Sequence, residues 1–124
     1  MQIAAAALFM ALLAAPVHAQ TTLQVPATSA SGAVIRVLDK ITGETTDLAI
    51  GRGQTKLYGR LTIVLGDCRY PTNDPNSDAF GWLEIRDDTI AEPAFSGWMV
   101  ASSPALEALD HPRYDVWLLR CNNS

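Results

Sequence analysis

The chain is poor in histidine, cysteine and clustered positive charge. It has 2 histidines, 2 cysteines and 9 Lys plus Arg against 13 Asp plus Glu, which gives a formal net charge of −4. An acidic chain without a basic cluster has no electrostatic reason to bind nucleic acid. One histidine, His18, lies in a predicted signal peptide and leaves only His111. We therefore expect no metal site and no cofactor.

Long apolar runs are also absent, except for one at the N-terminus. Residues 3–17 are rich in Ala and Leu, and Val17-His18-Ala19 resembles a signal peptidase site, although no Lys or Arg precedes the run. We predict a signal peptide over residues 1–19, cleaved after Ala19. An uncleaved anchor is the alternative, but the run is shorter than the roughly 20 residues that span a bilayer. The exported chain of 105 residues is long enough for one domain.

The two cysteines, Cys68 and Cys121, predict one disulfide in an exported chain. Two free buried thiols are the alternative. In the chain-entropy model, a bridge that closes a loop of this length stabilises the folded state by about 4 kcal/mol.

Composition divides the exported part into three segments. Residues 20–32 are rich in Thr, Ser and Ala and predict a flexible leader; residues 33–121 carry the folded domain; residues 122–124 form a frayed tail. Within the domain, short β-branched and aromatic segments are separated by Gly, Pro and Asp turns. The predicted strands are 33–38, 45–50, 55–58, 61–65 continuing toward Cys68, 80–86, 95–100 and 114–121.

One short helix is expected near the C-terminus. Ser103 can cap it, Pro104 fits its first position, and Pro112 ends it by Leu109. We expect Leu106 and Leu109 to share the face that packs on the sheets. The predicted fold is thus all-β, a small sandwich or partly open barrel of six to seven strands with one helix.

Several aromatic and loop residues are candidates for a binding surface. Residues 69–78 form the longest irregular segment, and loops of this kind are either functional or disordered. We expect Trp98 and Trp117 to be buried and leave Trp82 open, because aromatic side chains in small domains usually form the core. Gly97 predicts a bulge or a close backbone approach in its strand. The candidate surface is Trp82, Tyr70, Asp74, Asn76 and Tyr114.

Catalytic patterns are weak. Ser102 or Ser103, His111, and Asp110 or Asp115 supply the residue types of a hydrolase triad, but no Gly-x-Ser-x-Gly elbow surrounds the serines. Glu84 with Asp87, Asp88 or Glu92 would supply the carboxylates of a glycosidase, although such groups on a charged turn are usually solvated. We therefore predict no catalytic residues.

Two segments resemble a known family. They are Phe-Ser-Gly-Trp-Met-Val-Ala-Ser-Ser-Pro-Ala-Leu from Phe95 and His-Pro-Arg-Tyr-Asp-Val-Trp from His111, supported by Leu-Asp-Lys-Ile-Thr-Gly from Leu38. Together with the two cysteines they resemble exported bacterial proteins catalogued as domain of unknown function 2155, over residues 32–121. The resemblance implies a periplasmic location and brings no activity.

These observations favour a non-catalytic interaction, accessory or assembly module of the cell envelope. Edge strands and the 69–78 loop would make the contacts, and an envelope protein complex would be the partner. A carbohydrate- or peptidoglycan-binding domain is the alternative, and a small hydrolase using Ser103 and His111 is the third hypothesis.

Overall fold

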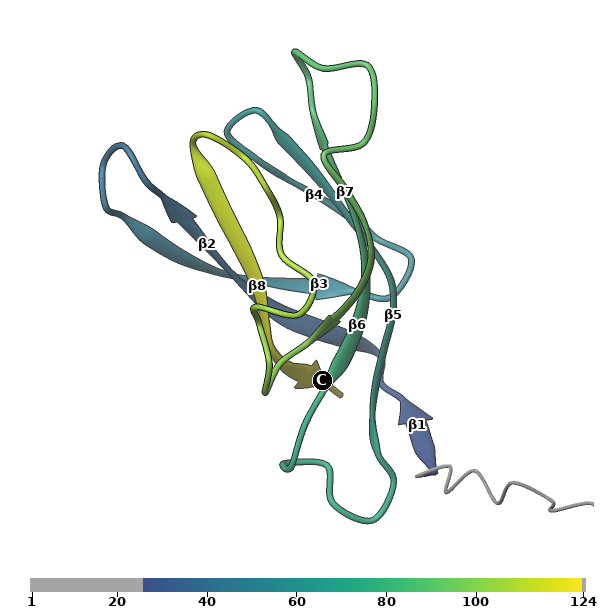
Figure 1. Ribbon diagram of the computed structural model, residues 1–124. Coiled ribbons are helices and arrows are strands. Elements are labelled where there is room, and N and C mark those ends of the chain that lie inside the picture. The colour runs from purple at the N-terminus through teal and green to yellow at the C-terminus, as the bar shows by residue number, and fades with distance from the viewer. Residues whose placement is uncertain (1–25, 124) are drawn as a thin grey trace, which may run out of the picture.

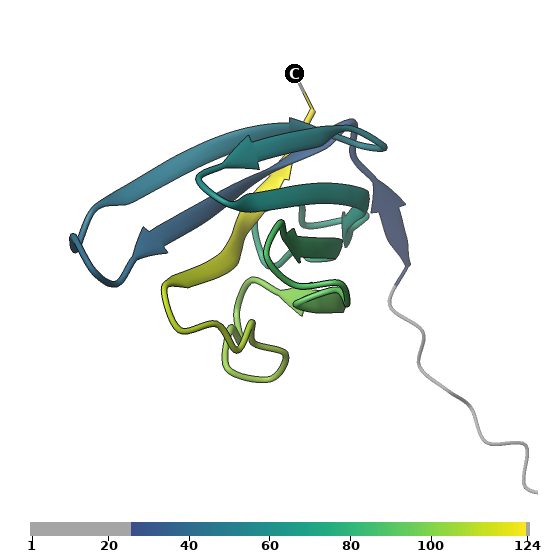
Figure 2. The ribbon, with the colours of Figure 1, turned by 90° about the horizontal axis from the view of Figure 1, so that it is seen from above.

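The computed structural model describes residues 26–123, and these form eight strands in two antiparallel sheets (Figures 1 and 2). The predicted signal peptide and its cleavage site lie outside the described residues. In the described part no helix is long and apolar enough to cross a membrane.

The first sheet has three strands in the order β3-β2-β8. The predicted hairpin is confirmed as β2 (Gly32–Asp39) and β3 (Thr45–Gly51), and β8 (Tyr114–Asn122) pairs with the other edge of β2. The turn of the hairpin forms because Asp39 accepts the backbone N–H of Ile41 at 2.9 Å and Gly43 adopts a φ of 75°. Its tip projects beyond the other strands (Figure 2).

The second sheet is built around β5 (Leu61–Pro71), which continues through Cys68 as predicted. It pairs on one side with β6 (Phe80–Asp87), and β7 (Phe95–Val100) follows β6. On its other side, β4 (Thr55–Tyr58) pairs with its first half and β1 (Ala27–Ser29) with its second half.

The core lies between the two sheets and follows the alternation of the strands. Leu61, Ile63 and Leu65 point inward, as expected, because successive side chains of a strand alternate between the two faces of the sheet. They meet inward side chains of β6 and β8. The buried cluster comprises Ala30, Ala33, Ile35, Val37, Ile50, Leu61, Ile63, Leu65, Cys68, Ala79, Leu83, Ile85, Met99, Leu109, Tyr114, Val116 and Leu118.

The folded part extends beyond the predicted boundaries at both ends. Residues 26–32, expected in the flexible leader, contain β1, and Ala30 is only 1% exposed. At the other end β8 includes Asn122, and the Asn123 side chain donates to the Tyr70 hydroxyl at 3.3 Å. Composition concealed both extensions, because strand pairing with β5 and β2 holds most of these residues and Ala30 is the core residue among them.

The predicted helix is absent from the structure. Residues 101–113 form turns, in which Ser103 N–H donates to the Val100 carbonyl and Leu106 N–H to that of Ser103. Leu109 is buried as expected, but Leu106 is 72% exposed. A helix of less than two turns has few hydrogen bonds to offset its nucleation, so it would have needed a packed apolar face.

Gly97 lies within β7 with a φ of 159° and not at a bulge. The β6–β7 register is continuous, and a Cβ at Gly97 would meet only the ring of Phe95, at 3.7 Å. The bulge in this sheet lies instead between Leu65 and Asp67 of β5.

The predicted disulfide is confirmed, and it links the two sheets. Cys68 of β5 and Cys121 of β8 are bonded with a Cα–Cα distance of 5.7 Å and a sequence separation of 53. We predict that replacing both cysteines by serine lowers the free energy of unfolding by about 4 kcal/mol, because the unfolded chain gains loop entropy. Urea unfolding of the variant and of the reduced wild-type protein measures this loss. Equal midpoints for the oxidised and reduced proteins would contradict it.

Candidate functional site

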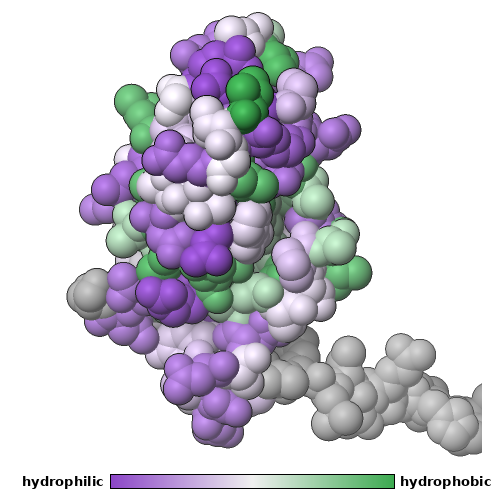
Figure 3. Space-filling model, turned by 90° about the vertical axis from the view of Figure 1, so that its left-hand side faces the viewer, coloured by the Kyte–Doolittle hydropathy of each residue, from purple (hydrophilic) through white to green (hydrophobic). Residues whose placement is uncertain are grey.

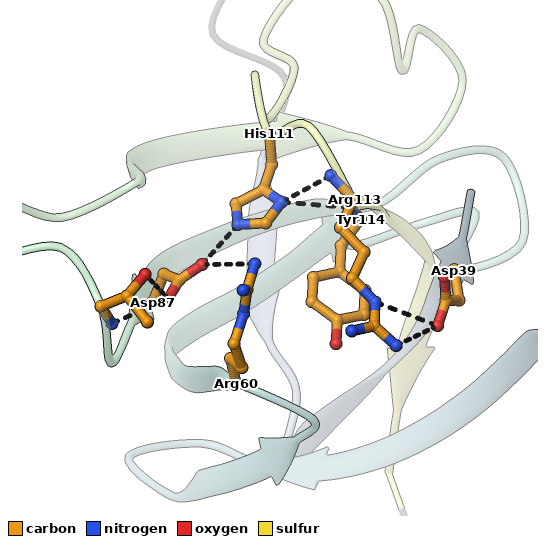
Figure 4. A network of polar contacts seen from close by, with 7 residues as sticks. Asp39, Arg60, Asp87, His111, Arg113 and Tyr114 are labelled. Atoms are coloured by element: carbon orange, nitrogen blue, oxygen red, sulfur yellow. Dashed lines mark hydrogen bonds and ion pairs between the residues drawn. The ribbon is translucent and has the colours of Figure 1, made fainter. Parts of the chain in front are cut away.

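A buried polar network joins the two sheets at one end of the molecule (Figure 4). Its centre is Asp87, the last residue of β6, which is 2% exposed. His111, which precedes β8, is 3% exposed, and its Nε2–H donates to Asp87 Oδ2 at 2.6 Å. The same carboxylate accepts the N–H and hydroxyl of Thr89 at 2.9 and 2.8 Å. Asp87 thus connects the end of β6 to the start of β8.

The hydrogen bonds fix the tautomer of His111. Its Nδ1 accepts the backbone N–H groups of Arg113 and Tyr114, at 3.0 and 3.1 Å. A backbone N–H can only donate, so Nδ1 carries the lone pair and Nε2 carries the hydrogen. His111 is therefore neutral here, and the positive charge beside Asp87 comes from Arg60, whose guanidinium lies 3.4 Å from Oδ2.

Asp87 and His111 resemble the carboxylate–histidine pair of a hydrolase, but His111 has no ring nitrogen free to accept a proton from a nucleophile. In a hydrolase triad, a carboxylate orients one ring nitrogen while the other takes the proton of the nucleophile. In this protein both nitrogens of His111 are engaged, one by Asp87 and one by two backbone N–H groups. Ser103 has no ring nitrogen of His111 available to activate it. The network is suited to holding the start of β8 in place.

Electrostatics agree with this structural role. Hydrogen bonds from the Thr89 N–H, from His111 and from the Thr89 hydroxyl hold the pKa of Asp87 well below its usual range, and Arg60 adds to the effect. A second pair lies beside the first: Arg113 donates to Asp39 Oδ2 at 3.0 Å and lowers the pKa of Asp39. Both carboxylates therefore stay ionised at neutral pH.

Tyr114 belongs to this network and not to the predicted binding surface. It is 2% exposed, packs edge-on against Tyr58 at 6.0 Å, and carries the Arg113 guanidinium over its ring at 5.2 Å. Its phenol lies against Gly59, which turns between β4 and β5 with a φ of 55°. From Tyr114 to Leu118 the even-numbered residues of β8 face the core, so Tyr114 is inside.

The other surface of interest is the outward face of the five-stranded sheet. We call it the aromatic face and define it by Phe80, Trp82 and Trp98. Trp82 of β6 and Trp98 of β7 are direct cross-strand partners, and Phe80 pairs with Arg69 of β5. The described residues form only two sheets, and the three-stranded one packs against the opposite side, so no strand covers the aromatic face (Figure 1).

Trp98 and Trp117 were expected to be buried in the core, and the structure shows that neither is. Trp98 is 42% exposed, because Met99 and not Trp98 takes the inward position of β7. Trp117 is half-buried on the outside of the three-stranded sheet, opposite Arg36. Trp82, left open by the sequence, is half-buried with its ring across Gly66, where a Cβ would approach the ring to 2.7 Å. Two tryptophans thus lie together on one surface.

The structure separates the remaining predicted surface residues. Asp74 and Asn76 are exposed on the loop 72–79, at the opposite end of the molecule from the loop 88–94 (Figure 1). Tyr70 is half-buried beside β1. The 72–79 loop is held by hydrogen bonds: Asp78 accepts the Ser102 N–H and hydroxyl at 3.0 and 2.7 Å. Burial alone would raise the pKa of Asp78, but these bonds and the Ala79 N–H outweigh it and lower that pKa.

The contrasting face of the molecule has no comparable cluster. Figure 3 shows the side of the β2–β3 hairpin, which is mainly hydrophilic with small scattered apolar areas. There Arg36 forms two hydrogen bonds with Asp47, at 2.7 and 3.1 Å. The aromatic face is therefore the stronger candidate for binding. Among residues 26–123, no three His, Cys, Asp or Glu side chains come together as a metal-ligand set.

Comparison with known proteins places the chain in a family. The family model described as "Uncharacterized protein conserved in bacteria (DUF2155)" matches residues 33–121. The chain belongs to this family. The match spans the strands from β2 to β8, both cysteines and the His111–Asp87 network. The DUF2155 region therefore covers the two-sheet domain except for β1.

A relative within the curated proteins supports the assignment. It is an uncharacterized protein of Rickettsia prowazekii (strain Madrid E), 31% identical over 90 residues, which cover 70% of this chain and 58% of that protein. The chain thus spans less than two thirds of the relative's length. No solved structure matches the chain.

The close approach of Tyr114 to Gly59 gives a prediction for this DUF2155 domain. Gly59→Ala should cost about 2–4 kcal/mol, since the new methyl meets the phenol in addition to the strain of a left-handed backbone. Gly43→Ala is the matched control, because its φ is also positive, at 75°, but an added Cβ would meet no atom within 4 Å beyond its chain neighbours. We therefore expect Gly43→Ala to lower the free energy of unfolding by about 1 kcal/mol. Equal losses in urea unfolding would contradict the packing of Tyr114 on Gly59.

The lowered pKa of Asp87 predicts how acid destabilises the fold. Because the folded-state pKa lies below the ordinary value of 3.8, the contribution of Asp87 to stability is present above that value. This contribution is lost as the pH falls from the ordinary pKa toward the lower pKa of Asp87 in the folded state. Asp87→Asn should therefore be less stable than wild type near neutral pH, and the difference should shrink as the pH approaches about 2.

Urea unfolding between about pH 7 and about pH 2 measures this difference. Asp88→Asn, a substitution of the exposed neighbouring residue, is the control and should leave the difference near zero. A gap between wild type and Asp87→Asn that does not change with pH would contradict the ionised state of Asp87.

Proposed function

We propose that this domain is a non-catalytic interaction module of the bacterial cell envelope, an accessory or assembly factor that is exported to the periplasm. Export rests on the predicted signal peptide, and the disulfide between Cys68 and Cys121 is consistent with an oxidising compartment. The aromatic face is the contact surface of this proposal. The observation that carries it is the 42% exposed Trp98 beside Trp82 on an uncovered sheet.

Energetics support such a surface. A tryptophan left partly in water loses the stabilisation that full burial would give, and tryptophans are enriched among the residues that dominate binding energy. Trp98 is bordered by half-buried rings and by charged residues such as Arg69 and Glu84. An apolar centre with a polar rim is the usual composition of a protein-binding surface.

The test is a crosslinked pull-down of the protein from envelope extract. Trp98→Ala should reduce recovery of a stoichiometric partner at least about tenfold, as expected for a central tryptophan. Ile41→Ala is the control, because Ile41 is 72% exposed on the β2–β3 hairpin, away from the aromatic face. Its recovery should equal that of wild type.

Two results would contradict this proposal. Equal recovery with Trp98→Ala would mean that the partner binds elsewhere. Loss of a cellular phenotype in Ser103→Ala, with unchanged stability and unchanged recovery of the partner, would favour the hydrolase alternative.

A carbohydrate-binding domain is the second candidate, and the pairing of Trp82 with Trp98 favours it. Two neighbouring rings on an open sheet offer stacking surface for sugar rings, whose faces consist of C–H groups. Asp67 and Glu84, which flank Trp82 on the same face, provide acceptors for hydroxyl groups. Tryptophan fluorescence that changes on titration with glycan fragments would support this candidate, and no response would remove it.

A further inference from the structure

A hollow of about 280 Å³ on the aromatic face combines two rings with one cation. It is lined by one residue from each of four strands: Ala27 of β1, Arg69 of β5, Phe80 of β6 and Trp98 of β7. Arg69 and Phe80 are direct cross-strand partners, and Trp98 is the diagonal neighbour of Phe80. The hollow is therefore a product of the strand register, which holds its walls in place.

Arg69 has most of its hydrogen-bonding capacity free. One guanidinium nitrogen donates to the Ala27 carbonyl at 3.3 Å, which keeps the side chain over the hollow. In the described part of the chain, no carboxylate forms an ion pair with Arg69. The arginines of the buried network differ in this respect: Arg60 pairs with Asp87 and Arg113 with Asp39. A guanidinium has five N–H donors, so several remain for a ligand.

The charge restricts what can cover this hollow. An apolar ligand would stack on Trp98 and Phe80 but would remove water from Arg69 without replacing it, which is costly. A ligand with an anionic group would instead form charge-assisted hydrogen bonds with the guanidinium. Ring contact and charge together thus require a ligand that has both an apolar face and an anion.

We propose that this hollow binds an anionic saccharide, with a sugar ring on Trp98 and its carboxylate on the Arg69 guanidinium. Hydroxyl groups at the edge of the ring lie toward polar groups of the same face. Ser29 is the cross-strand partner of Arg69 and donates to Asp67 Oδ2 at 3.2 Å. This inference rests on the second candidate function, a saccharide ligand, and adds the chemical class of that ligand.

Two disaccharides that differ by one acidic group test the proposal. The probes are N-acetylglucosamine linked to N-acetylmuramic acid with a free lactyl carboxylate, and neutral chitobiose. Isothermal titration of the purified protein should show at least about tenfold tighter binding of the acidic disaccharide, because a charge-assisted hydrogen bond is gained. Raising the salt concentration should reduce this preference, since Arg69 is exposed and salt screens its attraction to the carboxylate of the ligand.

Variants assign the two contributions to their residues. Arg69→Gln should reduce affinity for the acidic disaccharide about tenfold and leave chitobiose binding unchanged. Trp98→Ala should weaken both ligands, and Arg52→Gln, at an exposed arginine outside the hollow, should weaken neither. Arg69 and Trp98 are both at solvent-exposed positions, so the circular dichroism of both variants should match that of wild type. Urea unfolding then measures any loss of stability separately from the loss of affinity.

The outcomes separate this inference from the function on which it rests. Equal binding of both disaccharides, with no effect of Arg69→Gln, would overturn the anionic preference while a saccharide function stands. If neither disaccharide binds and fluorescence stays constant, both the saccharide function and this inference fail. Acidic preference that survives Arg69→Gln would place the anion elsewhere and overturn the assignment to this hollow.

Discussion

The buried carboxylate of Asp87 is the constraint on which one end of this fold depends. An ionised group that is 2% exposed must replace its lost water by hydrogen bonds and a nearby cation. Thr89, His111 and Arg60 supply them from three separate segments. Each segment is thereby positioned: the turn after β6, the approach to β8 and the turn before β5. A loop as irregular as residues 101–113 can end at a defined place because His111 is held there.

The disulfide ties the other end of β8 to the larger sheet. Cys68 and Cys121 connect β5 to the end of β8, whereas the Asp87–His111 bond connects the end of β6 to the start of β8. The last strand is thus tied to the larger sheet at both of its ends. Between these ties, apolar contacts fill the space between the sheets. The opposite surface of the larger sheet lies outside this core, because the three-stranded sheet does not pack on it.

Local sequence signals predicted the strands well, because each has its own alternation and is bounded by turn residues. The β2–β3 hairpin and the long β5 followed from such signals. The pairing of Cys68 with Cys121 followed instead from there being two cysteines in a chain expected to be exported. The helix prediction failed because Ser103-Pro104 is a local start signal, whereas such a short helix needs tertiary packing that Leu106 does not provide. Strand β1 was missed since only its partner β5 makes it a strand.

The polar network could be recognised only in part. Asp39 and Asp87 each end a strand and precede a turn, which is a signal for a carboxylate that accepts backbone N–H groups. The contact between His111 and Asp87, 24 residues apart, could not be predicted from local patterns, because it depends on how the two sheets pack. The catalytic hypothesis for His111 arose from residue types alone and loses its basis once both ring nitrogens are engaged.

The inward and outward faces of β6 and β7 differ in a way that bears on the aromatic face. In β6 and β7, the inward positions are occupied by Leu83, Ile85 and Met99, which are buried in the core. Trp82 and Trp98 therefore bury less apolar surface than inward positions would allow, and they contribute less to stability than their size would permit. Arg69 strengthens this point, since the cation lies beside aromatic rings without a carboxylate partner in the described residues, whereas the arginines of the buried network are paired. Large partly exposed rings and a cation without a carboxylate partner meet at one place on this face, and the core does not require either of them there.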